Sequence, residues 1–94
     1  MFTAAIIKKE VKMKSQIFNR AISSRRKLKF LYGLNEVTLE PYYLSIDRNG
    51  KKVIFGRVGN TNEVKKFEYN MITNIKVLNS KKFSPIIPIL TVLN

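Results

Sequence analysis

The sequence predicts a mainly β protein of the α+β class, in which an N-terminal helix precedes a five-stranded antiparallel barrel. Apolar residues recur at helical spacing only in the first part of the chain. Five short runs rich in β-branched and aromatic residues follow between positions 28 and 79, separated by turns that contain glycine or asparagine. The 94 residues have the length of one domain, which we expect to span 1–94 and to end in an apolar tail over 83–94.

The helix is predicted over about residues 10–24. One arc of it carries Ile7, Val11, Phe18, Ala21 and Ile22, at steps of 4, 7, 3 and 1, which is the pattern of a helix buried on one side. Lys14 falls on the same arc. Either its side chain runs along the apolar surface to water, or the helix begins only at Ser15, which is a good N-cap. We place the end before Arg25, because a longer helix would turn this side chain onto the apolar face.

The five strands are predicted at 28–32, 36–46, 51–58, 63–69 and 72–79. In the second of them, Val37 and Leu39 share one face. After Pro41 the apolar residues are Tyr42, Leu44 and Ile46, which have the other parity. Because a slip of one residue exchanges the two faces of a strand, we expect a bulge or bend at Pro41, where a residue without an N–H donor is tolerated.

Turn signals separate the strands. Residues 33–35 and 59–62 combine glycine with asparagine, and residues 70–71 divide the last two strands. The sequence Asp47-Arg48-Asn49-Gly50 predicts a tight hairpin, and its Asn-Gly pair favours a type I′ turn.

Composition excludes most catalytic chemistry. The chain has no His, Cys or Trp, so it offers no disulfide and no soft or imidazole ligand for zinc. A serine nucleophile would need a lysine base, and no serine lies in a nucleophile-elbow motif. Glu36 and Glu40 share a strand face that we expect to be solvent-exposed. We therefore expect no catalytic residues, no metal site and no cofactor.

Neither end of the chain predicts targeting to a membrane. The N-terminus lacks the positive region of a signal peptide. The tail is shorter than the ~20 residues of a membrane span, and its two prolines argue against a helix. We expect a cytoplasmic protein with no membrane partner.

Residues 16–83 resemble the WYL domain family. The resemblance rests on three features. Ala21 and Ile22 precede a basic run that leads into a strand ending at Tyr32, and Pro41 is followed three residues later by Leu44. The spacing from Gly50 to Lys65-Lys66-Phe67 also matches the family without a gap. The signature Trp-Tyr-Leu triplet falls on Lys52, Val53 and Ile54, and of the ligand-facing positions only Lys65 keeps a positive charge. The resemblance implies an Sm-like barrel that senses or binds nucleic acid or nucleotide-like ligands, usually in bacterial regulators or defence-associated proteins.

Positive charge dominates the chain. Eighteen Lys and Arg face six Asp and Glu, which gives a net charge of +12, and a field of this size favours anionic partners such as nucleic acid. The densest run is Arg25–Lys27. The predicted nucleic-acid-binding residues are Arg25, Arg26, Lys27, Lys52, Arg57, Lys65 and Lys66. The alternative is a solvated helix face in a lysine-rich composition.

Aromatic residues and the tail each allow two interpretations. The aromatic residues that interleave with lysines could stack bases or fill the core; they are Tyr42, Tyr43, Phe55, Phe67 and Tyr69. The tail either folds back over the open end or edge of the barrel, or pairs with a second copy or another protein. Its candidate partner-binding residues are Ile86, Ile87, Ile89 and Leu90.

Together these observations predict a non-catalytic binding or regulatory module for nucleic acid or a phosphate-bearing nucleotide ligand. The alternative is a small basic protein-docking module or inhibitor, phage-borne or defence-related, that acts through its apolar tail. A third, weaker alternative is a subunit of an Sm-like ring.

Overall fold

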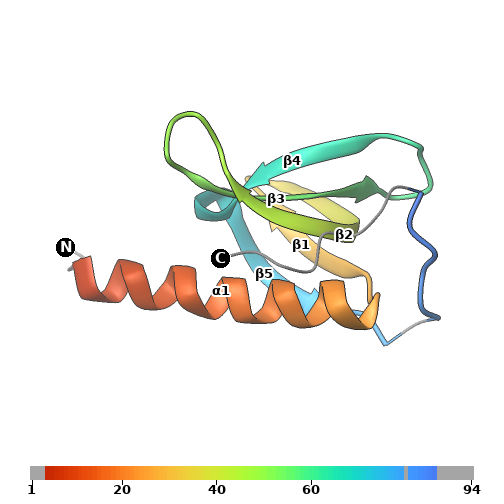
Figure 1. Ribbon diagram of the computed structural model, residues 1–94, viewed down its shortest axis with the longest axis horizontal. Coiled ribbons are helices and arrows are strands. Elements are labelled where there is room, and N and C mark those ends of the chain that lie inside the picture. Colours follow the sequence, from red (N-terminus) through yellow and green to blue (C-terminus); the bar gives the residue numbers. More distant parts are fainter. Residues whose placement is uncertain (1–3, 80, 87–94) are drawn as a thin grey trace.

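One helix packs on one curved antiparallel sheet in the computed structural model, which describes residues 4–79 and 81–86 (Figure 1). The elements are α1 (Ala4–Ser24), β1 (Leu28–Tyr32), β2 (Asn35–Ile46), β3 (Lys52–Val58), β4 (Val64–Glu68), the 3-10 helix η1 (Tyr69–Met71) and β5 (Ile72–Val77). The predicted class is confirmed, and each strand boundary lies within two residues of its predicted position.

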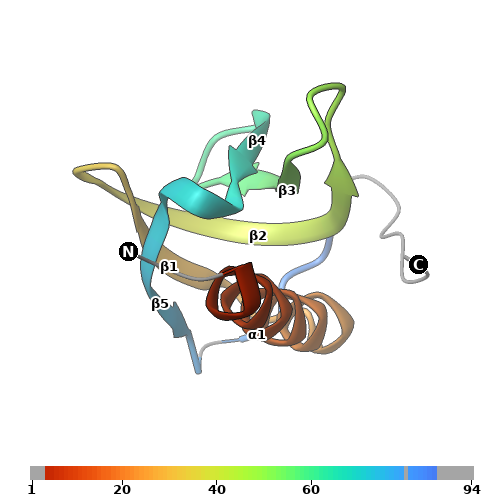
Figure 2. The same cartoon turned by 90° about the vertical axis from the view of Figure 1, so that its left-hand side faces the viewer.

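The strand order is β4-β3-β2-β1-β5, so β4 and β5 form the two edges. The sheet curls strongly, as the bend of β2 in Figure 2 shows. Among the described strands no ladder joins β4 to β5, so the sheet is open, whereas the sequence predicted a barrel. Side-chain contacts instead join the edge strand β4 to β1, the strand next to β5. The Tyr32 and Phe67 rings meet edge to face at 4.9 Å, and the Tyr32 hydroxyl accepts the Glu68 N–H at 3.2 Å.

The helix begins earlier than predicted, at Ala4 instead of about residue 10. Ser15 lies well inside α1 and is not its N-cap. Lys14 does not break the helix either, because its Nζ donates a hydrogen bond to the backbone oxygen of Tyr69 at 2.6 Å. The buried face of α1 carries Phe18 and Ile22, and α1 contacts β2 more extensively than any other strand.

A Schellman motif ends the helix after Ser24. The Arg25 N–H donates to the oxygen of Ile22 at 3.1 Å, and the Arg26 N–H donates to the oxygen of Ala21 at 2.9 Å. Arg25 has a φ of 54°, the left-handed conformation that this position requires and that glycine usually supplies. The first residue of the basic run therefore has a backbone role.

The distortion predicted in β2 is confirmed. Pro41 pairs with Gly56 and Tyr43 pairs with Phe55, so Tyr42 is an extra residue in the ladder. The bulge exchanges the two faces of the strand for the residues that follow it, so that both Leu39 and Leu44 reach the same core.

The β2–β3 hairpin differs from the predicted turn type. The Gly50 N–H donates to the Asp47 oxygen, and the Asp47 N–H donates to the Lys51 oxygen, each at 2.9 Å. Of Asn49 and Gly50, only Gly50 has a positive φ, of 78°. The loop is therefore a type I turn followed by a left-handed glycine. The Asp47 carboxylate supports it by accepting the N–H groups of Asn49 and Lys51, each at 2.9 Å.

A single cluster of buried side chains joins α1 to the concave side of the sheet. Its members are Phe18, Ala21, Ile22, Leu28, Phe30, Leu39, Leu44, Ile54, Phe67, Tyr69 and Ile72. Every element except the turns contributes to it, so the position of α1 relative to β2 and β3 is set by the core itself.

We predict that Gly56→Ala destabilises the protein by about 1–3 kcal/mol or more. A Cβ at Gly56 would lie 2.2 Å from the backbone oxygen of Glu40 and 2.8 Å from Cγ of Leu39, where the bulge presses β2 against β3. Urea denaturation measures the loss. As a control, Gly59→Asn should cost less than about 1 kcal/mol, because nothing lies within 4 Å of a Cβ there and asparagine tolerates a positive φ. Equal losses in the two variants would contradict the close contact.

Candidate functional site

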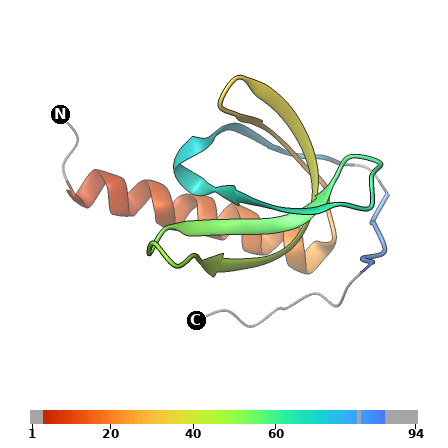
Figure 3. The ribbon, with the colours of Figure 1, turned by 90° about the horizontal axis from the view of Figure 1, so that it is seen from above.

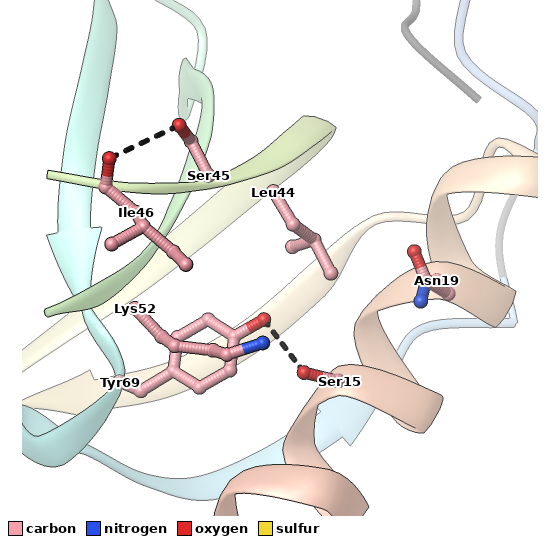
Figure 4. A pocket seen from close by; sticks show the side chains of 7 residues that line it. All are labelled: Ser15, Asn19, Leu44, Ser45, Ile46, Lys52 and Tyr69. Atoms are coloured by element: carbon pink, nitrogen blue, oxygen red, sulfur yellow. Dashed lines mark hydrogen bonds between the residues drawn. The ribbon is translucent and has the colours of Figure 1, made fainter. Parts of the chain in front are cut away.

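A cleft of about 490 Å³ lies between α1 and the β2–β3 hairpin, two elements that run alongside one another in Figure 3. Its lining residues are Ser15, Asn19, Leu44, Ser45, Ile46, Lys52 and Tyr69. Figure 4 shows Ser15 and Asn19 on the helix side of the cleft, facing the residues of the strands. A volume of this size falls within the usual range for small-ligand sites, roughly 300–1,000 Å³.

The helix wall of the cleft is polar. Ser15 and Asn19 lie one turn apart, beside the apolar arc that carries Phe18 and Ile22. The hydroxyls of Ser15 and Tyr69 are 3.1 Å apart and form one hydrogen bond. Because each hydroxyl carries one hydrogen, this bond uses only one of the two, and the other remains available to a ligand. The Asn19 amide adds two further donors.

Packing fixes Tyr69 at the base of the cleft. Its side chain is buried and meets Phe18 edge to face, with ring centroids 5.1 Å apart. Burial raises the pKa of the Tyr69 phenol, and the hydrogen bond with Ser15 acts in the opposite direction. Tyr69 therefore stays protonated at neutral pH and can serve as a hydrogen-bond donor.

Lys52 supplies the positive charge of the cleft. It pairs with Ile46 at the hairpin end of β3, and its side chain is exposed. In the part of the chain that the structure describes, no carboxylate lies within ion-pair distance of Lys52. The cleft thus combines an ammonium group, three hydroxyls and an amide with no lining carboxylate. This set of donors suits an anion with several oxygen acceptors, such as a phosphate group.

A smaller hollow of about 260 Å³ continues the cleft toward the hairpin tip and shares Lys52 and Tyr69 with it. Lys14, Lys51 and Glu10 also line it. Within residues 4–79 and 81–86, no three acidic side chains are close enough together to hold a metal ion.

The basic run Arg25–Lys27 lies away from the cleft. It precedes β1, whose first residue Leu28 pairs with Leu39, and Leu39 pairs in turn with Val58 at the far end of β3 from Lys52. Six residues of strand separate positions 52 and 58, about 20 Å. Arg25 is exposed, whereas Arg26 and Lys27 are half-buried. The predicted basic residues therefore do not form one continuous site.

Arg57 was predicted to bind nucleic acid, but the structure gives it a different role. Its guanidinium forms a two-pronged ion pair with Glu40, through Nε to Oε1 at 2.9 Å and through NH2 to Oε2. Its NH1 donates to the Thr61 oxygen at 3.0 Å. Glu40, expected to be solvent-exposed, is only 2% exposed. The hydrogen bonds with Glu40 raise the pKa of Arg57. Arg57 does not line the cleft.

Lys65 and Lys66 are exposed on the edge strand β4. They are neighbours in sequence, so they point to opposite faces of the strand. Lys65 pairs with Glu63 at 3.2 Å. Neither residue lines the cleft.

Most of the aromatic candidates belong to the interior. Phe67, Tyr69 and Tyr42 are buried. Tyr43 and Phe55 are half-buried and stack on one another, with ring centroids 4.6 Å apart and planes at 17°. Phe55 pairs with Lys66 across the ladder, so this pair is where aromatic and basic residues still adjoin at the surface.

The described part of the tail folds back onto β2. The Phe83 ring lies 5.9 Å from the Tyr42 ring, and the Phe83 N–H donates to the Arg25 oxygen at 3.2 Å. The Ile86 N–H donates to the Tyr42 hydroxyl at 3.1 Å, while the Ile86 side chain is 49% exposed. Through these contacts with Tyr42 the segment meets β2, which is a central strand and not an edge of the sheet. The other tail candidates, Ile87, Ile89 and Leu90, lie outside the described residues.

Sequence reasoning missed Ser15, Asn19 and Tyr69 as members of one site. The one signal in the sequence was the spacing of Ser15 and Asn19, four residues apart beside the apolar arc of the helix.

Comparison of the chain with protein-family models, curated proteins and solved structures finds no match. No helix in the described part of the chain has the length and apolar character needed to cross a membrane.

We predict that Arg57→Ala lowers the free energy of unfolding by about 3–5 kcal/mol, because it leaves the buried Glu40 carboxylate unpaired. The matched control is Lys65→Ala, which breaks the exposed ion pair with Glu63 and should cost less than about 1 kcal/mol. Urea denaturation compares the two variants. Similar losses in the two variants would contradict the prediction that the Arg57–Glu40 ion pair stabilises the fold more than the exposed Lys65–Glu63 pair.

A second prediction concerns the pH dependence of stability. Burial lowers the pKa of Lys14 below its ordinary value of 10.5, and the Glu10 carboxylate opposes the shift. Between the lowered pKa and 10.5 the unfolded chain binds more protons than the folded one, so the free energy of unfolding should rise with pH. Tyr69, whose pKa is raised above 10.0, acts in the opposite sense above that pH.

Urea denaturation at several pH values tests this dependence. Lys14→Met should flatten the rise between the lowered pKa and 10.5. Tyr69→Phe should keep that rise and lose the decline above pH 10. A Lys14→Met variant with the wild-type pH profile would contradict the assignment.

Proposed function

We propose that the protein is a WYL-like, non-catalytic binding module for nucleic acid or a phosphate-bearing nucleotide ligand, with the cleft between α1 and the β2–β3 hairpin as its ligand site. One observation carries the proposal. The cleft collects hydrogen-bond donors around Lys52, and no carboxylate lines it. In a chain with a net charge of +12, such a site attracts anions and gives them hydrogen-bond partners.

The helix extends this positive character beyond the cleft. Positions 8, 12, 15 and 19 follow steps of four, three and four residues, so Lys8 and Lys12 fall on the flank of α1 that carries Ser15 and Asn19. Both lysines are exposed. A polyanion held at Lys52 could therefore contact further cations along the helix, whereas a free nucleotide would use the cleft alone.

The resemblance to the WYL family supports the same class of ligand. The element order, one helix followed by five antiparallel strands, agrees with what that resemblance implies. We place the site of action in the cytoplasm, where nucleic acids and nucleotides are available.

We predict that Lys52→Gln weakens binding of labelled oligonucleotides by about one to two orders of magnitude, because a hydrogen bond to a charged group contributes about 1.5–3 kcal/mol. It should also reduce the slope of log affinity against log salt by about 0.7–0.9 for the lost phosphate contact. Fluorescence anisotropy with single- and double-stranded probes at low and moderate salt measures both quantities. The control Lys9→Gln removes the same charge from an exposed helix position outside the cleft.

Substitution of Arg25, Arg26 and Lys27 by Ala tests the original basic run in the same assay. If this run provides phosphate contacts, affinity falls equally for all sequences. If the triple variant binds like the wild type while Lys52→Gln does not, the cleft is the main site. Absence of wild-type binding to any probe at low salt would overturn the proposed function.

The second candidate is a protein-docking module or inhibitor, phage-borne or defence-related. The half-exposed Ile86 side chain favours it, because this residue begins the apolar end of the chain. Apolar docking would depend little on salt, unlike phosphate contacts.

A further inference from the structure

Two lysines face one another across the β1–β5 ladder. Lys29 on β1 pairs directly with Lys76 on β5, and residues paired in this way project to the same side of the sheet, with Cβ atoms about 4.5–5.5 Å apart. Like charges at such positions destabilise a sheet. The Glu36 carboxylate offsets part of the repulsion through an ion pair with Lys29 at 3.5 Å. Among the described residues, no carboxylate lies within ion-pair distance of Lys76.

An irregularity adjoins this pair. The register shifts between Lys29 and Leu31, so that Asn74 and Ile75 together oppose the single residue Phe30. Asn74 has a φ of 53°, the left-handed conformation that asparagine adopts more readily than most residues other than glycine. Bulges occur often beside active sites, where they redirect a side chain. Here the bulge includes Asn74, two residues before Lys76.

These residues surround a hollow of about 410 Å³, lined by Lys29, Phe30, Leu31, Glu36, Asn74, Ile75 and Lys76. It shares no residue with the cleft between α1 and the β2–β3 hairpin. Figure 2 shows β1 and β5 on the side of the molecule away from the β2–β3 hairpin. The lysine pair, the bulge at Asn74 and the hollow that these residues line thus occur together at one place on the sheet.

We propose that Lys29, Lys76 and Asn74 form a second anion site, which binds a phosphate group. An anion between the two ammonium groups turns their repulsion into two charge-assisted interactions, and the Asn74 amide donates a further hydrogen bond. Glu36 competes with the anion for Lys29. This proposal does not depend on the cleft, and the site serves either a free phosphate compound or the backbone phosphate of a nucleic acid.

Two-dimensional NMR of the amide groups tests the site at residue level. In titrations with inorganic pyrophosphate and with a short single-stranded oligonucleotide, the wild-type resonances of Lys29, Asn74 and Lys76 should shift at low salt. Lys29→Gln combined with Lys76→Gln should abolish these shifts and leave those of Asn19 in the cleft unchanged. Shifts with pyrophosphate indicate a free phosphate compound, and shifts with the oligonucleotide alone indicate a nucleic-acid backbone. Either result supports the site.

A charge-matched pair of variants sharpens the test. Glu36→Gln should tighten binding at this site about two- to five-fold, because it removes an exposed ion-pair partner of Lys29. Glu63→Gln changes the net charge by the same amount, but Glu63 pairs with Lys65, which lies outside this site. The substitution should therefore leave the affinity of the site for phosphate unchanged. Without phosphate, Lys76→Gln should raise Tm by about 1–4 °C through relief of the repulsion.

Three results would overturn the proposal. They are the absence of wild-type shifts with both probes, equal shifts in the double lysine variant, and weaker binding after Glu36→Gln. A loss of shifts at Asn19 alone would count against the cleft and leave this site standing.

Discussion

The extra residue at Tyr42 is the constraint on which the rest of the structure depends. Without it, the alternation of a regular strand would direct Leu39 and Leu44 to opposite faces of β2. With it, both enter the core, and β2, a strand of 12 residues, is the strand that α1 contacts most. The same bulge brings the β2 backbone so close to β3 that only glycine fits at position 56. Local geometry in one strand thus determines the packing of three elements.

Much of the fold could be predicted from the sequence, because its strongest signals are local. The change of apolar parity after Pro41 located the bulge, and glycine with asparagine located the turns. Two details escaped. The start of α1 was placed at about residue 10, later than its position at Ala4. The alternative start at Ser15 was considered because Lys14 falls on the apolar arc, and the partner of Lys14, the Tyr69 oxygen, lies 55 residues away in sequence. The turn type at Asn49-Gly50 was also wrong, since both possible turns accept this pair of residues.

The candidate site was less predictable, because two residues of the same type of charge can have different partners on the neighbouring strand. Arg57 and Lys52 are both cations on β3, but Arg57 pairs across the ladder with Glu40 and Lys52 pairs with Ile46. That difference follows from the register, which the bulge sets. Ser15 and Asn19 could not be assigned without knowing how α1 lies against the hairpin. Composition therefore indicated the class of partner, and only the tertiary structure separates a structural cation from an available one.

The Tyr42 hydroxyl also determines how much of the chain belongs to the folded unit. It accepts the Ile86 N–H and donates to the Glu40 carboxylate at 3.3 Å, so the segment beyond the last strand is bonded to the buried ion pair. A chain cut after β5 would retain every strand, yet it would lose the Phe83 ring that covers Tyr42. The contacts that cover Tyr42 therefore come in part from the segment that follows the sheet.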